Sequence, residues 1–133
     1  MDKKRVLIVE DELNVLKMTK YRLEHEGYAV IVAMDGESAL KEAKAAKEDF
    51  PIHLILLDIR LPKLNGYQVC QMLKDEPSTA HIPVIIFTAS ESQMELLADR
   101  CVEIGATDWI KKPFQTKELM KKIRHALAEG KST

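Results

Sequence analysis

The chain has 133 residues, 46% of them hydrophobic and 31% charged, and its 20 basic and 21 acidic side chains leave a formal charge of −1. This length and composition are typical of one folded domain with one hydrophobic core, not of a disordered tail. The balanced charge provides no basic surface for nucleic acid or an anionic membrane. No apolar segment is long enough to span a bilayer, and no signal-peptide-like stretch follows the charged start. We therefore expect a cytoplasmic protein without direct nucleic-acid or membrane contact, folded as one domain over residues 1–133 with a core of about 4–128.

Strand-like and helix-like segments alternate along the whole chain. Short apolar runs predict five strands, at residues 5–9, 28–33, 54–58, 84–88 and 107–111. Apolar positions at helical spacing predict five helices, the first ending at Gly27, the second after Asp35, the third over 67–74, the fourth from Ser90 and the fifth over 116–129. Five βα units with short connections predict an α/β fold, a doubly wound five-stranded parallel sheet with helices on both faces.

Local signals add detail to three of these helices. Met18 and Leu23 belong to the expected inward stripe of the first helix. Asp35 is the expected N-cap of the second helix. Ser90 followed by Gln93 matches a capping box, which predicts the start of the fourth helix.

Carboxylates stand at the ends of two predicted strands. Asp58 follows the apolar run 54–57, and Glu10, Asp11 and Glu12 follow the first strand. The carboxyl ends of parallel strands share one rim of the sheet, where open α/β folds build their sites. Because clustered carboxylates repel one another, they stay ionised together only beside a cation. Such oxygen ligands suit Mg²⁺, so a Mg²⁺ site is predicted if these two strands are neighbours.

Two further strand ends carry groups suited to phosphate. Thr88 supplies a hydroxyl after the fourth strand, and Lys112 supplies a compact positive charge after the fifth. Taken singly, each has a plainer interpretation, Thr88 as a strand-favouring residue, Lys112 as a solvated charge and Asp58 as a loop cap. Glu10 to Glu12 alone could equally favour the start of the following helix. The four strand ends together favour a phosphate site with a cation.

In these residues the chain resembles the receiver domain of two-component response regulators. The resemblance covers essentially the whole chain, with one motif after each strand end: Val9-Glu10-Asp11-Glu12, Leu57-Asp58-Ile59-Arg60-Leu61-Pro62 with Gly66 after it, Phe87-Thr88-Ala89, and Lys112-Pro113-Phe114. It implies a flavodoxin-like sheet of strand order 2-1-3-4-5, in which the first and third strands are adjacent.

The resemblance implies a role for each acidic residue. Asp58 is the expected phosphoacceptor, which takes a phosphoryl group from the phosphohistidine of a sensor histidine kinase or a histidine phosphotransfer protein. Glu10, Asp11, Asp58 and the backbone carbonyl of Arg60 are the expected surroundings of Mg²⁺. Receivers more often have aspartate where this chain has Glu10, which leaves direct or water-mediated metal contact open at that position.

The resemblance also implies phosphoryl contacts and a switch. Thr88, Ala89 and Lys112 are the expected contacts of the phosphoryl oxygens, with Ala89 small enough to leave a path to the site. Trp109 holds the place of the aromatic switch, which turns inward when Thr88 moves toward the phosphoryl group. Lys112–Pro113 is an expected cis peptide. The remodelled surface would signal to an output protein whose identity stays open, with the chain a monomer or a phosphorylation-dependent dimer.

Two other functions compete with this interpretation. An aspartyl-phosphate phosphatase of the haloacid dehalogenase type carries a second acid two residues after its nucleophile, where this chain has Arg60. A degenerate receiver that only binds proteins would need none of Asp58, Thr88 and Lys112. We expect no enzyme in the usual sense, because the protein assists only its own phosphorylation and dephosphorylation.

Overall fold

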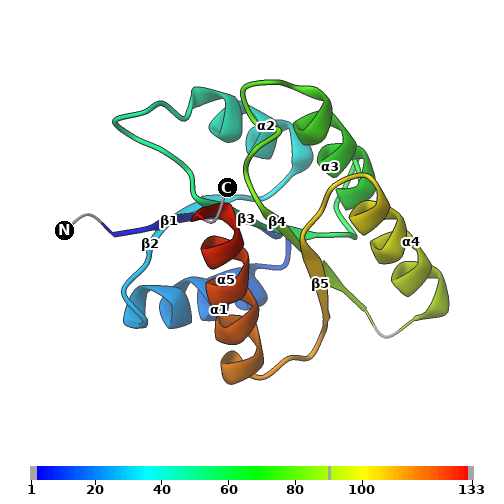
Figure 1. Cartoon of the computed structure of the whole chain (residues 1–133). Coiled ribbons are helices and arrows are strands. Elements are labelled where there is room, and N and C mark those ends of the chain that lie inside the picture. The colour runs from blue at the N-terminus through cyan, green and yellow to red at the C-terminus, as the bar shows by residue number, and fades with distance from the viewer. Residues whose placement is uncertain (1–2, 90, 132–133) are drawn as a thin grey trace.

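The computed structural model describes residues 3–89 and 91–131, which form five strands and five helices in strict alternation (Figure 1). The strands are short and the connections compact. The elements are β1 Arg5–Val9, α1 Leu13–His25, β2 Ala29–Ala33, α2 Gly36–Ala45, β3 Leu54–Asp58, α3 Gly66–Asp75, β4 Val84–Thr88, α4 Ser92–Glu103, β5 Asp108–Lys111 and α5 Thr116–Lys131.

All five strands join one parallel sheet in the order β2-β1-β3-β4-β5. The predicted fold class and strand order are confirmed. β3 lies at the centre, with Val9 of β1 paired with Leu57 on one side and Phe87 of β4 paired with Asp58 on the other. The carboxyl ends of β1, β3, β4 and β5 therefore meet at one rim.

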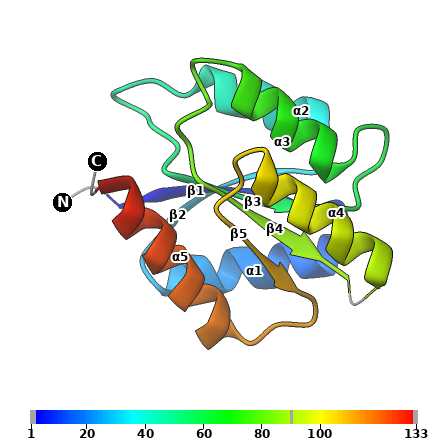
Figure 2. The same ribbon diagram turned by 45° about the vertical axis from the view of Figure 1, so that its right-hand side comes forward.

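The hydrophobic core has two layers, one on each face of the sheet. Successive strand residues point to opposite faces, so Leu7 packs with the helices of one face while Val6 and Ile8 pack with those of the other. Figure 2 shows α2, α3 and α4 on one side of the sheet and α1 and α5 on the other. Because β3 and β4 are covered on both faces, all of their residues are buried, which accounts for their continuous apolar runs.

Side-chain caps and a left-handed glycine fix several helix ends. The Asp35 side chain accepts a hydrogen bond from the Ser38 backbone N–H at 2.7 Å, as predicted for α2. Gly27 adopts φ of +95° just after α1, a conformation that glycine adopts without steric cost. A capping box that the sequence prediction missed starts α3, with Asn65 and Gln68 each accepting a bond from the other's backbone at 2.9 Å.

The predicted inward position of Met18 is wrong, since this side chain is 54% exposed. The next residue, Thr19, is buried instead, and its hydroxyl donates to the Val15 carbonyl at 2.8 Å. This bond to the preceding turn satisfies the hydroxyl and lets a polar residue face the core.

The start of α4 also differs from its prediction. The helix begins at Ser92 with Glu91 as the N-cap residue, so it does not start from the predicted Ser90–Gln93 capping box. Ser90 itself lies outside the described residues. Among the residues that the structure describes, no helix is both long and apolar enough to cross a membrane.

Candidate functional site

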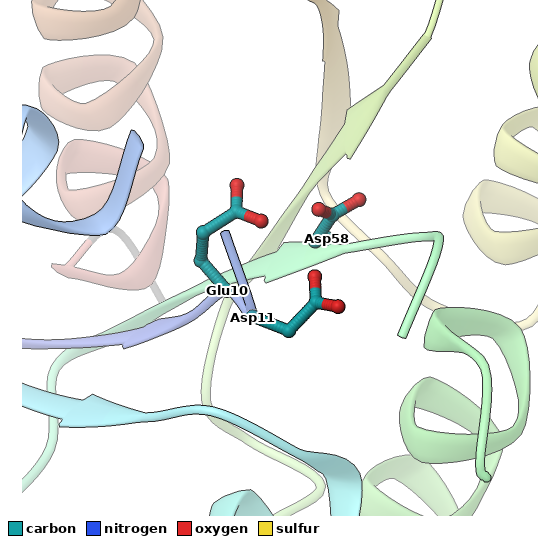
Figure 3. A group of neighbouring side chains, drawn as sticks. All are labelled: Glu10, Asp11 and Asp58. Atoms are coloured by element: carbon teal, nitrogen blue, oxygen red, sulfur yellow. The ribbon is translucent and has the colours of Figure 1, made fainter. Parts of the chain in front are cut away.

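The predicted acidic residues converge at the carboxyl ends of β1 and β3. Glu10 follows β1, and its backbone N–H donates to the Ala33 carbonyl at 3.0 Å, which extends the pairing with β2 by one residue. Asp58 is the last residue of β3. Figure 3 shows the side chains of Glu10, Asp11 and Asp58 gathered at this rim. The sheet order, with β1 beside β3, is what brings them together.

One oxygen atom from each of these three carboxylates lies within 4.8 Å of the other two. Glu10 and Asp58 are buried, at 1% and 5% exposure, while Asp11 is exposed. Three hard oxygen donors at this spacing form a set that could hold Mg²⁺, which prefers carboxylates together with retained waters. The exposed Asp11 leaves one side of the cluster open to water.

Lys112 joins the two buried carboxylates. Its Nζ lies 2.5 Å from Glu10 Oε1 and 2.9 Å from Asp58 Oδ2. Its backbone N–H donates to the Thr88 carbonyl at 2.7 Å, which extends the pairing of β4 and β5. The Lys112–Pro113 peptide bond is cis. From the end of β5, the lysine thus reaches Asp58 two strands away in the sheet and Glu10 three strands away.

Burial perturbs the ionisation of this cluster. The pKa of Glu10 is raised to about 7, chiefly by desolvation and also by hydrogen bonding with Asp58, while Lys112 acts to lower it. For Lys112 itself, burial alone would lower the pKa, but the hydrogen bonds to Glu10 and Asp58 outweigh it and leave the pKa raised. The lysine therefore stays charged, and Glu10 titrates near neutral pH.

A cavity of about 410 Å³ opens beside the cluster. Its lining comes from the ends of four strands, β1, β3, β4 and β5, and consists of Asp11, Glu12, Asp58, Arg60, Ala89 and Lys112. Ala89 presents only a methyl group, which leaves space next to Asp58. Thr88 ends β4 fully buried, and its hydroxyl donates to the Ala89 carbonyl at 3.3 Å. Of the predicted phosphoryl contacts, Ala89 and Lys112 line the cavity.

The loop after Asp58 is packed tightly against the end of β3. The Arg60 backbone N–H donates to Asp58 Oδ1 at 3.0 Å, which orients that carboxylate. Gly66 donates its N–H to the Ile59 carbonyl at 2.8 Å. A Cβ at Gly66 would lie 2.5 Å from the Asp58 carbonyl oxygen, so only glycine allows α3 to start this close to β3.

One contact beside the site was missed by the sequence analysis. The Arg60 guanidinium donates to Glu91 at 2.9 Å, and both side chains are largely exposed. This ion pair connects the loop after β3 to the loop after β4. No sequence signal could have revealed it, because the two residues are 31 positions apart and meet only through the sheet.

Trp109 lies on β5, the edge strand next to β4. It is paired with Ile86 of β4, and its half-buried ring packs against the core layer beneath α2, α3 and α4. The indole N–H donates to Asp99 of α4 at 3.1 Å. The ring is therefore turned toward α4 in this structure.

Comparison with known proteins identifies the class to which this fold and site belong. The family model of the response regulator receiver domain matches residues 6–124. The alkaline phosphatase synthesis transcriptional regulatory protein PhoP of Bacillus subtilis is 37% identical over 93% of this chain and 48% of its own length. Response regulator ArlR of Staphylococcus saprophyticus is 38% identical over 92% of this chain and 52% of its own length.

Solved structures agree with these matches. A CheY-like response regulator receiver domain protein from Methanospirillum hungatei superposes with a TM-score of 0.84 at 26% identity, covering 98% of both chains. A second match is the receiver domain of sensor histidine kinase PA1611 from Pseudomonas aeruginosa, solved with a magnesium ion coordinated in its active site cleft. It superposes with a TM-score of 0.83 at 28% identity, covering 96% of this chain and 99% of that one.

The chain belongs to the receiver domains of two-component response regulators. It spans about half the length of the curated relatives it matches, 48% of PhoP and 52% of ArlR.

Proposed function

We propose that Asp58 accepts a phosphoryl group from a phosphohistidine of a sensor histidine kinase or a histidine phosphotransfer protein. An oxygen of the Asp58 carboxylate would form a bond to phosphorus while the bond from phosphorus to the histidine nitrogen breaks. The imidazole leaves with the electron pair of that bond. The observation that supports this role best is the position of Asp58, buried yet facing a cavity, with Lys112 Nζ 2.9 Å away.

The chain's own groups around Asp58 suit this transfer. The Arg60 N–H holds one carboxylate oxygen at 3.0 Å and so fixes the direction of attack. The Lys112 ammonium, which bonds to Glu10 in this structure, would exchange that contact for one with the phosphoryl oxygens. Ala89 leaves room for the group, and the Thr88 hydroxyl would turn from the Ala89 carbonyl to a phosphoryl oxygen.

The carboxylates of Glu10, Asp11 and Asp58 fit Mg²⁺, with the Arg60 backbone carbonyl as a further proposed ligand. When bound, the ion supplies positive charge that offsets the negative charge of the phosphoryl oxygens. The raised pKa of Glu10 is consistent with a site built for a cation, because a buried carboxylate cluster is costly to ionise without one.

The output is proposed to pass through Trp109. When Thr88 turns toward the phosphoryl group, the ring leaves its position against α4 and turns inward. This movement would remodel the surface of α4, β5 and α5, where an output protein of unidentified kind would bind. We treat residues of about 4–128 as the receiver unit, acting as a monomer or a phosphorylation-dependent dimer. It would turn over no external substrate, and the cytoplasm is its proposed location.

The test is the intact mass of the protein after incubation with a small phosphodonor and Mg²⁺. We expect one added phosphoryl group that requires Mg²⁺ and is absent in Asp58→Asn, which keeps the shape of the side chain. No adduct with any donor would favour a degenerate receiver that acts only as a binding module. Steady release of phosphate from added monoesters would favour a phosphatase.

A further inference from the structure

Two carboxylates of α4 hold two residues of the edge strand β5. The Trp109 indole donates to Asp99 at 3.1 Å, and Lys111 Nζ lies 2.7 Å from Glu95. Trp109 and Lys111 face the same side of the strand, since they are two residues apart. Glu95 and Asp99 lie one helical turn apart and so share a face of α4. Figures 1 and 2 show α4 running beside β5.

The bond to Asp99 selects one orientation of the Trp109 ring. Trp109 is the only tryptophan of the chain, and its ring is half-buried against the core. The apolar part of an indole can pack in several orientations, but its N–H can only donate and needs an acceptor. Asp99 supplies that acceptor from α4, at the exposed edge of the ring.

We propose that Asp99 is a positioning residue that holds Trp109 in the orientation of the unphosphorylated protein and thereby opposes the switch. The proposal rests on the function of Trp109 proposed above. When the ring turns inward, its N–H leaves Asp99 and this bond is lost. A contact made in only one of two states shifts their equilibrium by its own free energy. Removing the Asp99 acceptor therefore favours the phosphorylated arrangement before any phosphoryl group binds.

The test uses equilibrium binding of beryllium fluoride, a mimic of the phosphoryl group, to the full chain in Mg²⁺, followed by Trp109 fluorescence. We expect Asp99→Ala to reach half-saturation at about threefold to tenfold lower concentration, the range that one hydrogen bond supports. Asp99→Asn keeps an accepting oxygen and should stay within about twofold of the wild type. Glu103→Ala, which removes another exposed carboxylate of the same helix, is the matched control and should not shift.

A second measurement separates the bond from a change in charge or folding. In Trp109→Phe the donor is gone, so adding Asp99→Ala should leave half-saturation unchanged when binding is followed by calorimetry. No shift in Asp99→Ala, an equal shift in Asp99→Asn, or a shift that persists with Trp109→Phe would overturn the proposal.

The proposed function fails in a different way. It is contradicted if beryllium fluoride binding to the wild type is absent or does not require Asp58. In that case the fluorescence of the unliganded variants still decides the role of Asp99. A changed emission and a greater sensitivity to quenching in Asp99→Ala but not Asp99→Asn would show that the carboxylate holds the ring, and identical spectra would show that it does not.

Discussion

The Lys112 ammonium and the Glu10 carboxylate lie 2.5 Å apart, although 102 positions separate them in the chain. Glu10 is almost completely buried, and the lysine side chain is 22% exposed. Because the same ammonium also bonds to Asp58, a single cation holds two carboxylates that would otherwise repel each other. The energy of the site therefore depends on how much positive charge the cluster contains.

Removal of the Lys112 charge should make stability depend on Mg²⁺. Lys112→Met keeps most of the apolar side chain but leaves two buried carboxylates without their cation, and we expect a loss of about 3–5 kcal/mol in the free energy of unfolding. Added Mg²⁺ should restore part of it. Urea unfolding with and without Mg²⁺ measures both effects. Lys122→Met is the control, since Lys122 pairs with Asp108 outside the cluster at 2.9 Å. An equal loss with and without Mg²⁺ would contradict the expectation.

Mg²⁺ binding should strengthen as pH rises through neutrality. The pKa of Glu10 is raised from 4.5 to about 7, so between these values the folded state holds a proton that the unfolded state has released. Glu10 thus favours folding fully below pH 4.5, and this contribution is lost as pH rises through about 7. Since Mg²⁺ binds the ionised carboxylate, its affinity follows the opposite trend and binding releases a proton.

Calorimetric titration with Mg²⁺ in two buffers of different ionisation enthalpy would detect this proton. Glu10→Gln cannot ionise and should abolish both the proton release and the change of affinity near neutral pH. If the glutamine variant keeps the wild-type pH profile, another group is responsible.

The acyl phosphate should be shorter-lived when Arg60 is replaced. Arg60 lines the cavity beside Asp58, and its guanidinium could shield the phosphoryl group from water. In Arg60→Ser we expect phosphate to be lost about twofold to fivefold faster, the range that a partly exposed ionic contact supports. Intact mass after rapid removal of the phosphodonor follows the loss. Arg124→Ser changes the charge equally on α5, away from the cavity, and should have no effect. An unchanged lifetime in Arg60→Ser would remove the shielding role.

Gly66 should tolerate no side chain. In Gly66→Ala the new Cβ would meet the Asp58 carbonyl oxygen at 2.5 Å and Ile59 Cα at 2.6 Å, both of them backbone atoms. We expect a loss of about 1–3 kcal/mol in the free energy of unfolding, measured with urea. Gly36→Ala is a useful comparison, because its Cβ would meet only the Val69 and Leu64 side chains and should cost less. Equal losses would show that the close backbone approach is not the cause.

The parts of the fold that follow from local pattern were predictable from the sequence. β3 and β4 are buried on both faces, so their apolar runs identify them without further context. Parallel strands share one rim, and this places Glu10 and Asp58 together once β1 and β3 are known to be neighbours. That adjacency came from the family resemblance, since periodicity does not specify the order of strands.

Contacts between distant surface elements were not predictable. The Arg60–Glu91 and Trp109–Asp99 contacts join loops or edges that only the assembled sheet brings within reach. The exposure of Met18 was also not predictable. Thr19 is buried instead, because its hydroxyl donates a hydrogen bond to the Val15 carbonyl within α1. Hydrophobicity alone ranks these two residues in the opposite order.

The strand order has a consequence for how such a protein can diversify. Asp58, Thr88 and Trp109 lie on three successive strands, from the centre of the sheet to its edge. Asp58 thus has a neighbouring strand on either side, while the surface proposed above for an output partner belongs to the outermost strand and its adjoining helices. Under the proposed function, substitutions on the outer surface of that margin would alter which partner binds while Asp58 keeps its bonds to Arg60 and Lys112.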